Sequence, residues 1–385
     1  MSEYQYYEFR AVDRPLTQKQ MDELRSYSSR ASISPDSFVN EYNWGDLKGD
    51  PDRWMEKYFD AFLYLANWGT RRLMLRVPTS VVDPADVREY CSDDSLNCRI
   101  NGDNLIISFR SDEEESEWAE GEGWLGSLIQ LRSDLTHGDY RCLYLGWLLA
   151  AQAGEFDDDV LEPPLPAGLG TLHAPLRSLV DFLRIDLDLI AAAAERSATE
   201  SAGRLRKEEI ADWVAKLPPK DKDAVLTRLL TGDDLHIAAE LRRRALSEIR
   251  CEGKSRGDLI TSDRRTVSEL IGRSEAIDEQ RQKREAQQQE RERAERERAQ
   301  AEERKKRIEA LSGKESTVWA QVDKLIATRQ PGRYEEAVLL LKDLLDLADL
   351  QGTGPEFAKR MRALYLEHAK KTTLLERFRK AKLSD

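Results

Sequence analysis

The first 110 residues alternate between apolar and polar positions in a pattern that predicts strands separated by short helices. Three apolar residues spaced two apart mark a half-buried first strand: Tyr7, Phe9 and Ala11. Thr17 and Gln20 have the spacing of a capping box, so a helix is expected to begin there. Two more helices are expected, one over residues 50–58 and one opened by Asp83-Pro84.

Further strands are predicted near 62–66 and 72–77, and a last pair is expected to meet at Asn101-Gly102, a strong hairpin signal. Residues 1–110 are therefore expected to form a small α/β head, with one antiparallel or mixed sheet and helices on one side of it. The overall fold class expected for the chain is α+β.

The pattern changes to a helical one after an acidic linker predicted over residues 111–122. Apolar residues then recur at helical spacing in several short segments, including Lys207–Leu217, Pro219–Leu230 and Leu235–Arg250. Short helices joined by short loops predict an all-α bundle over residues 123–275.

Residues 276–311 are predicted to form one long, solvent-exposed, charged helix. Between Ile277 and Ile308 the only hydrocarbon side chains are four alanines, whereas Glu, Gln, Arg and Lys favour helix throughout. Three pairs have the favoured i, i+4 order: Glu292 with Arg296, Glu302 with Lys306, and Glu303 with Arg307. A coiled coil requires apolar residues at a and d, which are missing here. The segment is interpreted as a single helix that acts as a spacer about 50 Å long.

Apolar spacing returns beyond Gly313. Four amphipathic segments follow, around Val322, Leu341, Met361 and Leu375, and they predict a domain of helical hairpins over residues 312–385, similar in style to tetratricopeptide arrays.

The charge distribution is uneven. The chain has a formal charge of −12, yet residues 359–382 carry 9 basic and 2 acidic side chains. An acidic body repels nucleic acid and anionic membranes at long range, so a general nucleic-acid-coating role is disfavoured and only the basic tail is left as a local contact.

The four cysteines, Cys91, Cys98, Cys142 and Cys251, lack the spacing of a zinc knuckle or redox pair. They are interpreted as reduced thiols of a cytoplasmic protein. The longest apolar stretch, around 143–151, is far shorter than a membrane span, so no membrane contact is expected.

No segment predicts a catalytic, cofactor-binding or metal site. Gly121–Gly126 matches the dinucleotide fingerprint as a string, but the acidic residues before it would repel a phosphate. Asp157-Asp158-Asp159 lacks the register of a calcium loop. The four histidines lie in different segments and no nucleophile elbow accompanies them. A non-enzymatic protein without cofactors is therefore expected.

Aromatic and cationic residues interleave in the head, which is typical of surfaces that bind peptides or stack on bases. The candidate partner-binding residues of this region are Tyr42, Trp44, Lys48, Trp68, Arg71 and Arg72. A second candidate surface is the basic tail, with Lys370, Lys371, Arg377, Arg379, Lys380 and Lys382. The alternative interpretation is that Trp54 and Tyr42 belong to the core, that Arg71 and Arg72 form a solvated strand edge and that the tail cations complement helix dipoles.

The segments Val322–Pro331, Tyr334–Leu347 and Leu374–Phe378 resemble the C-terminal helical region of bacterial SWIM zinc-finger proteins, over about 70 residues. The Cys-x-Cys and Cys-x-His zinc motif of those proteins is missing here, so the resemblance does not imply zinc or nucleic-acid binding by that finger. The rest of the chain resembles a widespread bacterial protein family, a likeness that implies no particular activity.

These patterns favour a scaffold protein in which the charged helix holds two protein-binding domains apart. The alternative is an accessory subunit of a nucleic-acid-processing or defence complex, which contacts nucleic acid through the basic tail or the Trp/Arg surface of the head. A hydrolase or transferase with a cryptic site is the third hypothesis.

Overall fold

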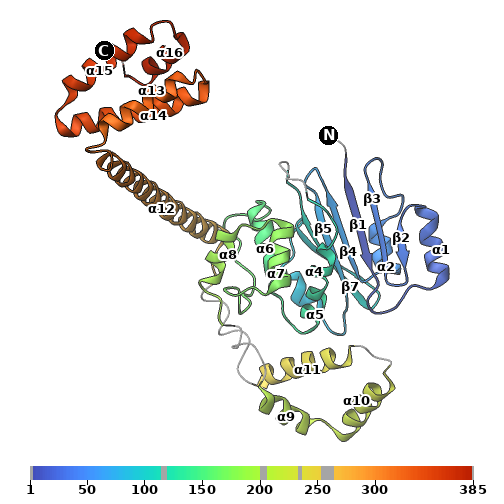
Figure 1. The fold of residues 1–385 in the computed structure, drawn as a ribbon. Coiled ribbons are helices and arrows are strands. Elements are labelled where there is room, and N and C mark those ends of the chain that lie inside the picture. Colours follow the sequence, from blue (N-terminus) through green and yellow to red (C-terminus); the bar gives the residue numbers. More distant parts are fainter. Residues whose placement is uncertain (1–2, 114–118, 200–205, 233–235, 253–263, 384–385) are drawn as a thin grey trace. The chain divides into compact units, whose positions relative to one another are not determined.

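The head contains a seven-stranded antiparallel sheet, which confirms the expected α+β class. The computed structural model describes residues 3–113, 119–199, 206–232, 236–252 and 264–383. The strand order is β2-β3-β1-β4-β5-β7-β6, so β1 lies between β3 and β4 and β4 is the central strand (Figure 1). The strands are β1 (Gln5–Arg10), β2 (Ser32–Ser34), β3 (Ser37–Tyr42), β4 (Ala61–Ala66), β5 (Arg71–Pro78), β6 (Leu96–Asn101) and β7 (Asn104–Ser111).

Local sequence signals account for several boundaries in the head. Helix α1 (Gln18–Tyr27) begins at the predicted capping box of Thr17 and Gln20. The Asp50 and Asp83 side chains accept hydrogen bonds from the first-turn amides of α2 (Pro51–Lys57) and α3 (Pro84–Arg88). Strands β6 and β7 form the predicted hairpin, and Gly102 has φ of +58° in its turn. Strands β2 and β3, rich in Ser, Asn and Glu, were not predicted from the pattern.

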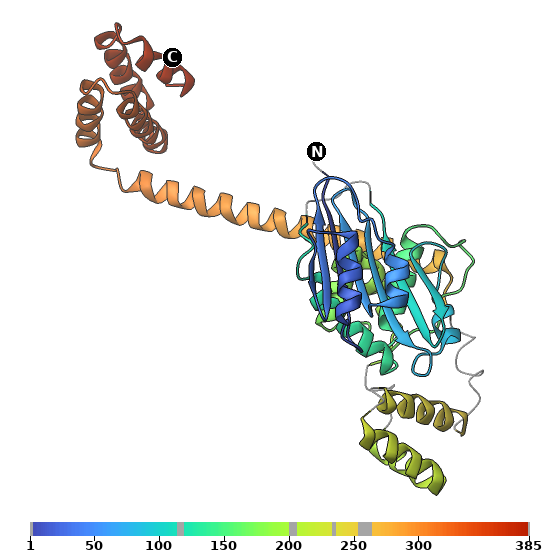
Figure 2. The same ribbon diagram turned by 90° about the vertical axis from the view of Figure 1, so that its right-hand side faces the viewer.

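Both faces of the sheet are buried, so the expectation of helices on one side was wrong. Phe9, Phe62 and Met74 belong to a core on the face covered by α1 and α2 (Figure 2). The alternate residues Leu63, Leu73 and Ile107 belong to a second core on the other face. Because strands such as β4 are apolar at consecutive positions, each face needs its own cover.

The second face is covered by helices that the sequence analysis assigned to a separate bundle over 123–275. They share one hydrophobic core with the sheet, so the boundary expected at 111–122 does not separate two cores. Residues 114–118 of that linker lie outside the described residues. The covering helices are α4 (Trp124–Leu128), α5 (Gln130–Thr136), α6 (Arg141–Gln152), α7 (Ala174–Leu183) and α8 (Leu187–Ala194).

Three further helices form a small group with its own core of Trp213, Leu217 and Ala245. They are α9 (Lys207–Lys216), α10 (Pro219–Thr231) and α11 (Ile237–Glu252), close to the predicted ranges. Gly232, with φ of +69°, ends α10. Arg243 of α11 donates a hydrogen bond of 2.9 Å from Nη1 to the carbonyl oxygen of Thr79, which links the group to the head.

The long helix α12 (Val267–Glu309) begins nine residues earlier than the predicted 276. Thr266 and Glu269 form its capping box, because the Glu269 carboxylate accepts the Thr266 amide and the Thr266 hydroxyl accepts the Glu269 amide. Its start is held by backbone bonds from Glu162 N to Arg265 O and from Val267 N to Val160 O, both 2.9 Å.

A buried ion pair reinforces this attachment. The Arg265 guanidinium donates to both carboxylate oxygens of Glu162, at 2.9 and 3.2 Å, and to the carbonyl oxygen of Ala192 at 2.7 Å. The Tyr144 hydroxyl donates to the same carboxylate at 2.9 Å. The two charged side chains are only 3 and 5 % exposed, so each depends on the other for compensation of its charge.

Contacts divide the chain into two units within α12, Met1–Arg281 and Gln282–Asp385. The second unit has its own core, formed by α13 (Glu315–Ala327), α14 (Pro331–Gln351), α15 (Gly354–Glu367) and α16 (Thr372–Lys380). Trp319 packs against Phe357 in this core, with ring centroids 5.6 Å apart. The four helices occupy the four segments predicted to be amphipathic.

Replacing Arg265 with methionine is expected to lower the free energy of unfolding of the first unit by about 3–5 kcal/mol, because Glu162 would remain buried without a counter-charge. The measurement is urea unfolding followed by tryptophan fluorescence, since seven of the eight tryptophans precede residue 282. The matched control is Arg273→Met, which breaks the exposed pair with Glu195 and should cost less than about 1 kcal/mol. Equal losses in the two variants would contradict a special role for the buried pair.

Candidate interaction surfaces

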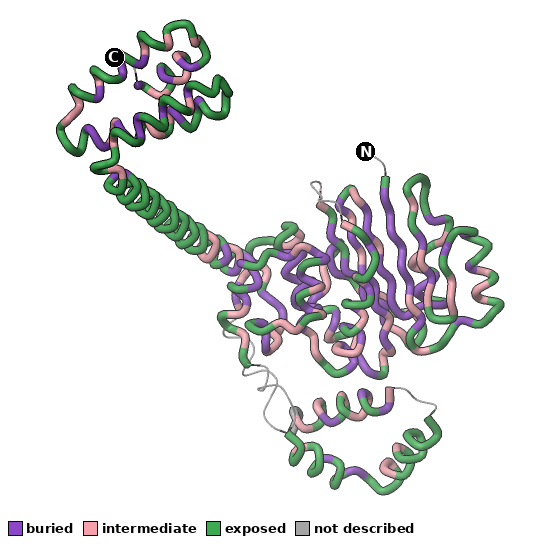
Figure 3. Tube along the Cα trace, viewed as in Figure 1, coloured by how far each residue is buried: buried purple, intermediate pink, exposed green. Residues whose placement is uncertain are grey.

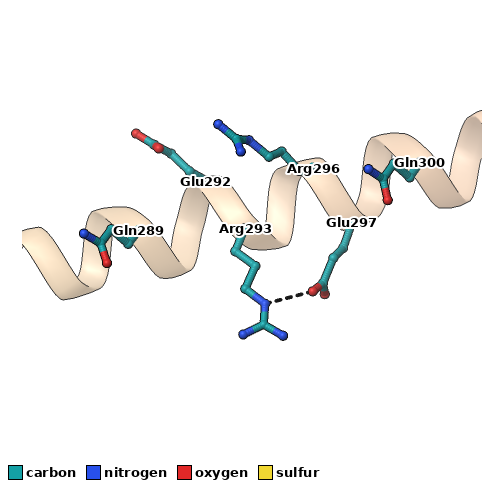
Figure 4. A pocket seen from close by; sticks show the side chains of 6 residues that line it. All are labelled: Gln289, Glu292, Arg293, Arg296, Glu297 and Gln300. Atoms are coloured by element: carbon teal, nitrogen blue, oxygen red, sulfur yellow. Dashed lines mark hydrogen bonds and ion pairs between the residues drawn. The ribbon is translucent and has the colours of Figure 1, made fainter.

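The candidate sites on the described part of the chain are open surfaces. Within the described residues, no group of three or more His, Cys, Asp or Glu side chains is arranged to hold a metal ion. A surface hollow on α12 is lined by Gln289, Glu292, Arg293, Arg296, Glu297 and Gln300 (Figure 4). All six belong to one helix, and Arg293 and Glu297 pair at 3.0 Å. It is a space between neighbouring side chains of one helix, with no second element to enclose a ligand.

The Gly121–Gly126 string has a packing role in the structure. A Cβ atom built on Gly121 would come within 2.1 Å of the Tyr6 ring, and the Gly121 amide donates to the Tyr4 hydroxyl at 3.3 Å. Gly123 precedes α4, which is only five residues long. The glycine at 121 is therefore needed for close approach of the backbone to an aromatic ring.

The two candidate tryptophans of the head lie at the end of the sheet where β1 begins. Trp44 follows β3 and is 79 % exposed, and Trp68 lies in the β4–β5 turn and is 45 % exposed. Both segments bond to the start of β1, through Gln5 Nε2 to Gly45 O at 2.8 Å and Tyr4 N to Asn67 Oδ1 at 3.0 Å. Lys48 in the same loop as Trp44 is exposed. This sheet end therefore presents aromatic surface to solvent.

Tyr42 has a structural position at the edge of this region. It is half-buried, and its ring meets the buried Tyr7 ring edge-on at 5.8 Å. The Tyr7 hydroxyl in turn donates to Asp46 Oδ1 at 2.6 Å. Burial and the hydrogen bond to Asp46 raise the pKa of Tyr7 well above its usual range, so it is a neutral donor in this network. The network fixes the loop that carries Trp44.

Arg71 lies inside the molecule. Its Nη1 donates to the carbonyl oxygens of Asp181 and Phe182 at 3.1 and 2.7 Å, in the last turn of α7. Burial, together with the charge of Arg184, lowers the pKa of the Arg71 guanidinium to about 10. The side chain thus compensates the orphan carbonyls of a helix C-terminus and joins α7 to the sheet.

Arg72 is occupied on the opposite face. Its guanidinium makes a two-pronged ion pair with Asp52 of α2, at 3.0 and 2.8 Å, and its Nε donates to the Ser108 hydroxyl at 3.1 Å. Of the six head residues, the structure therefore leaves three exposed, namely Trp44, Lys48 and Trp68. Arg71 and Arg72 hold helices to the sheet.

The basic tail lies on α16 and the loop before it. Lys371 donates to the carbonyl oxygen of Ile326 at 3.1 Å, near the end of α13, and Arg377 pairs with Glu335 at 3.5 Å. Lys370, Arg379, Lys380 and Lys382 are exposed. Helix α15 adds three more exposed cations, Lys359, Arg360 and Arg362. The exposed surface of α15 and α16 is thus rich in cations, and Leu374 and Phe378 anchor α16 to the core.

Sequence reasoning missed an apolar surface on α10. No residue of this helix is buried, and three leucines, Leu226, Leu229 and Leu230, are exposed, the last by 84 %. Their spacing is that of one helix face, which was visible in the sequence but was assigned to a bundle core. An apolar helix face of this kind in water is typical of a protein-contact surface.

Neither the family models nor the curated proteins nor the solved structures compared with this chain gave a match. Among the helices that the structure describes, none combines the length and the apolar composition that crossing a bilayer demands.

Arg71→Ala is expected to lower the free energy of unfolding by about 1.5–3 kcal/mol, because two hydrogen bonds from a charged donor to buried carbonyls are lost. Trp44→Ala, which removes an exposed side chain of the same unit, should change it by less than about 0.5 kcal/mol. Urea unfolding of the two variants gives the comparison. A stable Arg71→Ala protein would return this residue to the list of binding candidates.

Proposed function

We propose that the protein is a non-enzymatic scaffold whose two units each bind a protein partner, with α12 as a rigid spacer between the two binding surfaces. The observation that carries the proposal is the continuous exposure of α12: all residues from 279 to 307 are exposed although the helix is unbroken (Figure 3). A helix that buries so little gains nothing from a core, and spacing accounts for its retention.

Attachments near the two ends of α12 support the spacer role. In the first unit, Arg281 pairs with Asp188 at 2.8 Å, beyond the Arg265 anchor. In the second unit, Arg307 pairs with the buried Asp343 at 2.6 Å, and Arg304 pairs with Asp346. Because side chains near each end of the helix bond to a folded core, the helix cannot swing freely against either core.

Charge pairs along the helix support its stability in water. Glu302 and Lys306 pair at 2.8 Å as predicted, and Arg293 and Glu297 pair at 3.0 Å. Arg307, expected to pair with Glu303, instead bonds Asp343 of α14. Such i, i+4 pairs contribute about 0.2–0.5 kcal/mol each, which suffices over many turns to favour helix. At 1.5 Å per residue the 43-residue helix is about 64 Å long.

Exposed apolar groups in the first unit support protein binding. Trp44 and Trp68 at the sheet end, and the leucines of α10, are side chains of the kind that anchor protein–protein interfaces when a partner excludes water from them. In the second unit the exposed cations of α15 and α16 suit an acidic partner.

The spacer is tested by spin labels on cysteines introduced at Gln280 and Gln300 in a chain whose native cysteines are replaced. Double electron–electron resonance should give one narrow distribution of label-to-label distances. It should be centred at about 30 Å, because 20 residues of helix rise by 1.5 Å each. Replacing residues 283–298 by an equal length of Gly-Ser should broaden the distribution, whereas Glu-Ala-Ala-Ala-Lys repeats should keep it narrow. A broad distribution in the native sequence would contradict the spacer.

Partner binding is tested by affinity capture of the full chain from its native host. Trp44→Ala with Trp68→Ala is expected to lose one set of proteins, and Arg379→Ala with Lys380→Ala and Lys382→Ala another. The Leu187→Ala control removes a different exposed apolar side chain of the first unit and should lose neither. Capture of identical proteins by all variants would argue against these surfaces as binding sites.

The cationic α15–α16 face favours a second candidate function, contact with nucleic acid as an accessory subunit. Seven exposed cations lie on α15, α16 and the segments beside α16, while the head arginines Arg71 and Arg72 bond internal partners. Of the two nucleic-acid surfaces that the sequence suggested, the tail is therefore the better supported.

This candidate predicts salt-dependent binding to a single-stranded oligonucleotide. Removing Arg379, Lys380 and Lys382 should make the slope of log K against log salt less steep by about 2, since each phosphate contact contributes about −0.7. Fluorescence anisotropy measures this, and the control removes Arg291, Arg293 and Arg298 of α12, the same charge at another place. If the captured material has the 260/280 nm absorbance ratio of protein alone, the scaffold function is favoured over contact with nucleic acid.

A further inference from the structure

Two cysteines that are seven positions apart in the sequence meet at the edge of the sheet. Cys98 lies on the edge strand β6, where it pairs with Ile107 of β7 in the register. Ile107 faces the core shared with α4–α8, so Cys98 points to that side of the sheet. Cys91 follows α3, which packs against β6, and both cysteines border the same core.

The two thiols lie close enough for each to shift the pKa of the other. The Cys91 thiol donates to the carbonyl oxygen of Val87 at 3.5 Å, one turn back in the chain. The positive charge of Arg88, the last residue of α3, also acts on both thiols. Both cysteines are half-buried, which leaves them within reach of small solutes, in contrast to the buried Cys142.

The segment between the cysteines is held in place. Ser92 N donates to Leu96 O at 2.7 Å, and Leu96 N donates to the Ser92 hydroxyl at 3.0 Å. The carboxylate of Glu155, just beyond α6, accepts the amides of Asp94 and Ser95, both at 3.0 Å. The bond between Ser92 and Leu96 folds the segment back on itself, which brings Cys91 next to the start of the strand that carries Cys98.

The electrostatic surroundings differ between the two thiols. The neighbouring Cys91 thiol and the positive charge of Arg88 lower the pKa of Cys98 to about 7. The neighbouring Cys98 and burial raise the pKa of Cys91 far above its usual range. This difference favours Cys98 as the attacking sulfur and Cys91 as the thiol that keeps its proton.

We propose that Cys91 and Cys98 form a reversible redox site, in which a hydroperoxide oxidises Cys98 and Cys91 resolves the product to an intramolecular disulfide. The observation that carries it is the placement of two half-buried cysteines, one just after α3 and one on β6, at the border of the same core, with Arg88 at the end of α3. The site is independent of the scaffold proposal, since neither Trp44 nor the basic face takes part.

The chemistry is balanced in two steps. The Cys98 thiolate attacks one oxygen of the hydroperoxide, the O–O bond breaks, and the other oxygen leaves as an alcohol or water after taking a proton from solvent. Cys98 is then a sulfenic acid. The Cys91 sulfur attacks the Cys98 sulfur, the S–O bond breaks, and the hydroxyl group leaves as water with the Cys91 proton. Two thiols are oxidised by two electrons and one peroxide is reduced.

The experiment exposes the full-length protein, carrying Cys251→Ser, to hydrogen peroxide at pH 7, followed by alkylation, trypsin and mass spectrometry. Both cysteines fall in one tryptic peptide, Glu89–Arg99, so a disulfide appears as that peptide two hydrogen masses lighter and without alkylation. Dithiothreitol should restore it. Cys142, in another peptide, should react at least about tenfold more slowly, because burial raises its pKa.

Three variants separate the steps. Cys91→Ser should stop the disulfide and leave a Cys98 sulfenic acid that dimedone traps. Cys98→Ser should leave Cys91 alkylatable after the same treatment. Arg88→Gln changes an exposed residue and should raise the pKa of Cys98, because a nearby positive charge is lost. At a pH below that pKa the thiolate fraction falls tenfold for each unit of increase, so the rate of thiol loss should fall about tenfold as well. Disulfide formation at an unchanged rate in Arg88→Gln would remove the role of the cation.

Equal oxidation of Cys142 and Cys98, a disulfide between two chains, or stable sulfinic acid at Cys98 in the wild-type pair would each overturn the proposal. The wild-type peptide alone decides the central point, so the result does not depend on whether the serine variants fold. The two proposals are tested separately. Disulfide formation is read from the peptide whatever proteins are captured, and failure to form the disulfide would not contradict the scaffold proposal.

Discussion

The ion pair between Glu162 and Arg265 is the constraint on which the arrangement of the first unit and the helix after it depends. Both charges are almost completely buried, and Tyr144, the Ala192 carbonyl and two backbone bonds complete their partners. The pair brings together chain segments more than 100 positions apart, on the two sides of the α9–α11 insertion. Because the charges of the pair compensate each other only in one geometry, the pair fixes where α12 starts on the core of the first unit.

Charged side chains serve two distinct purposes in this molecule, and composition alone does not separate them. Arg71, Arg72 and Arg265 point inward and join helices to the sheet or to a loop, whereas the arginines in the middle of α12 point into water and pair along a single helix. Guanidinium suits both uses, since it donates in several directions and stays charged under burial. The exposed tryptophans show the opposite behaviour, because a residue type that is usually buried lies on the surface. Trp44 is therefore a better indicator of a partner surface than any of the head arginines.

Local signals were sufficient for most elements, while the tertiary arrangement was not available from the sequence pattern. Thr17 with Gln20, Asp50 and Gly232 act within a few residues, so they marked helix ends correctly. The two-sided sheet was missed although β4 has no polar alternation, which is itself the signature of burial on both faces. Arg71 could not be assigned inward, because its acceptors lie 110 positions away and are backbone carbonyls, which leave no trace in side-chain identity. The proximity of Cys91 to Cys98 depends likewise on the strand register of β6.

The unbroken geometry of α12 has a consequence for how the chain can change in length. One turn contains 3.6 residues, so inserting a single residue in the exposed stretch would lengthen the helix by about 1.5 Å and also rotate everything after it by about 100° around the helix axis. Eighteen residues make five whole turns and restore the original azimuth. A change in the length of this helix is therefore also a change in rotation about its axis. Under the scaffold proposal, insertions of seven, eleven or eighteen residues, which come close to whole turns, should be tolerated better than other lengths.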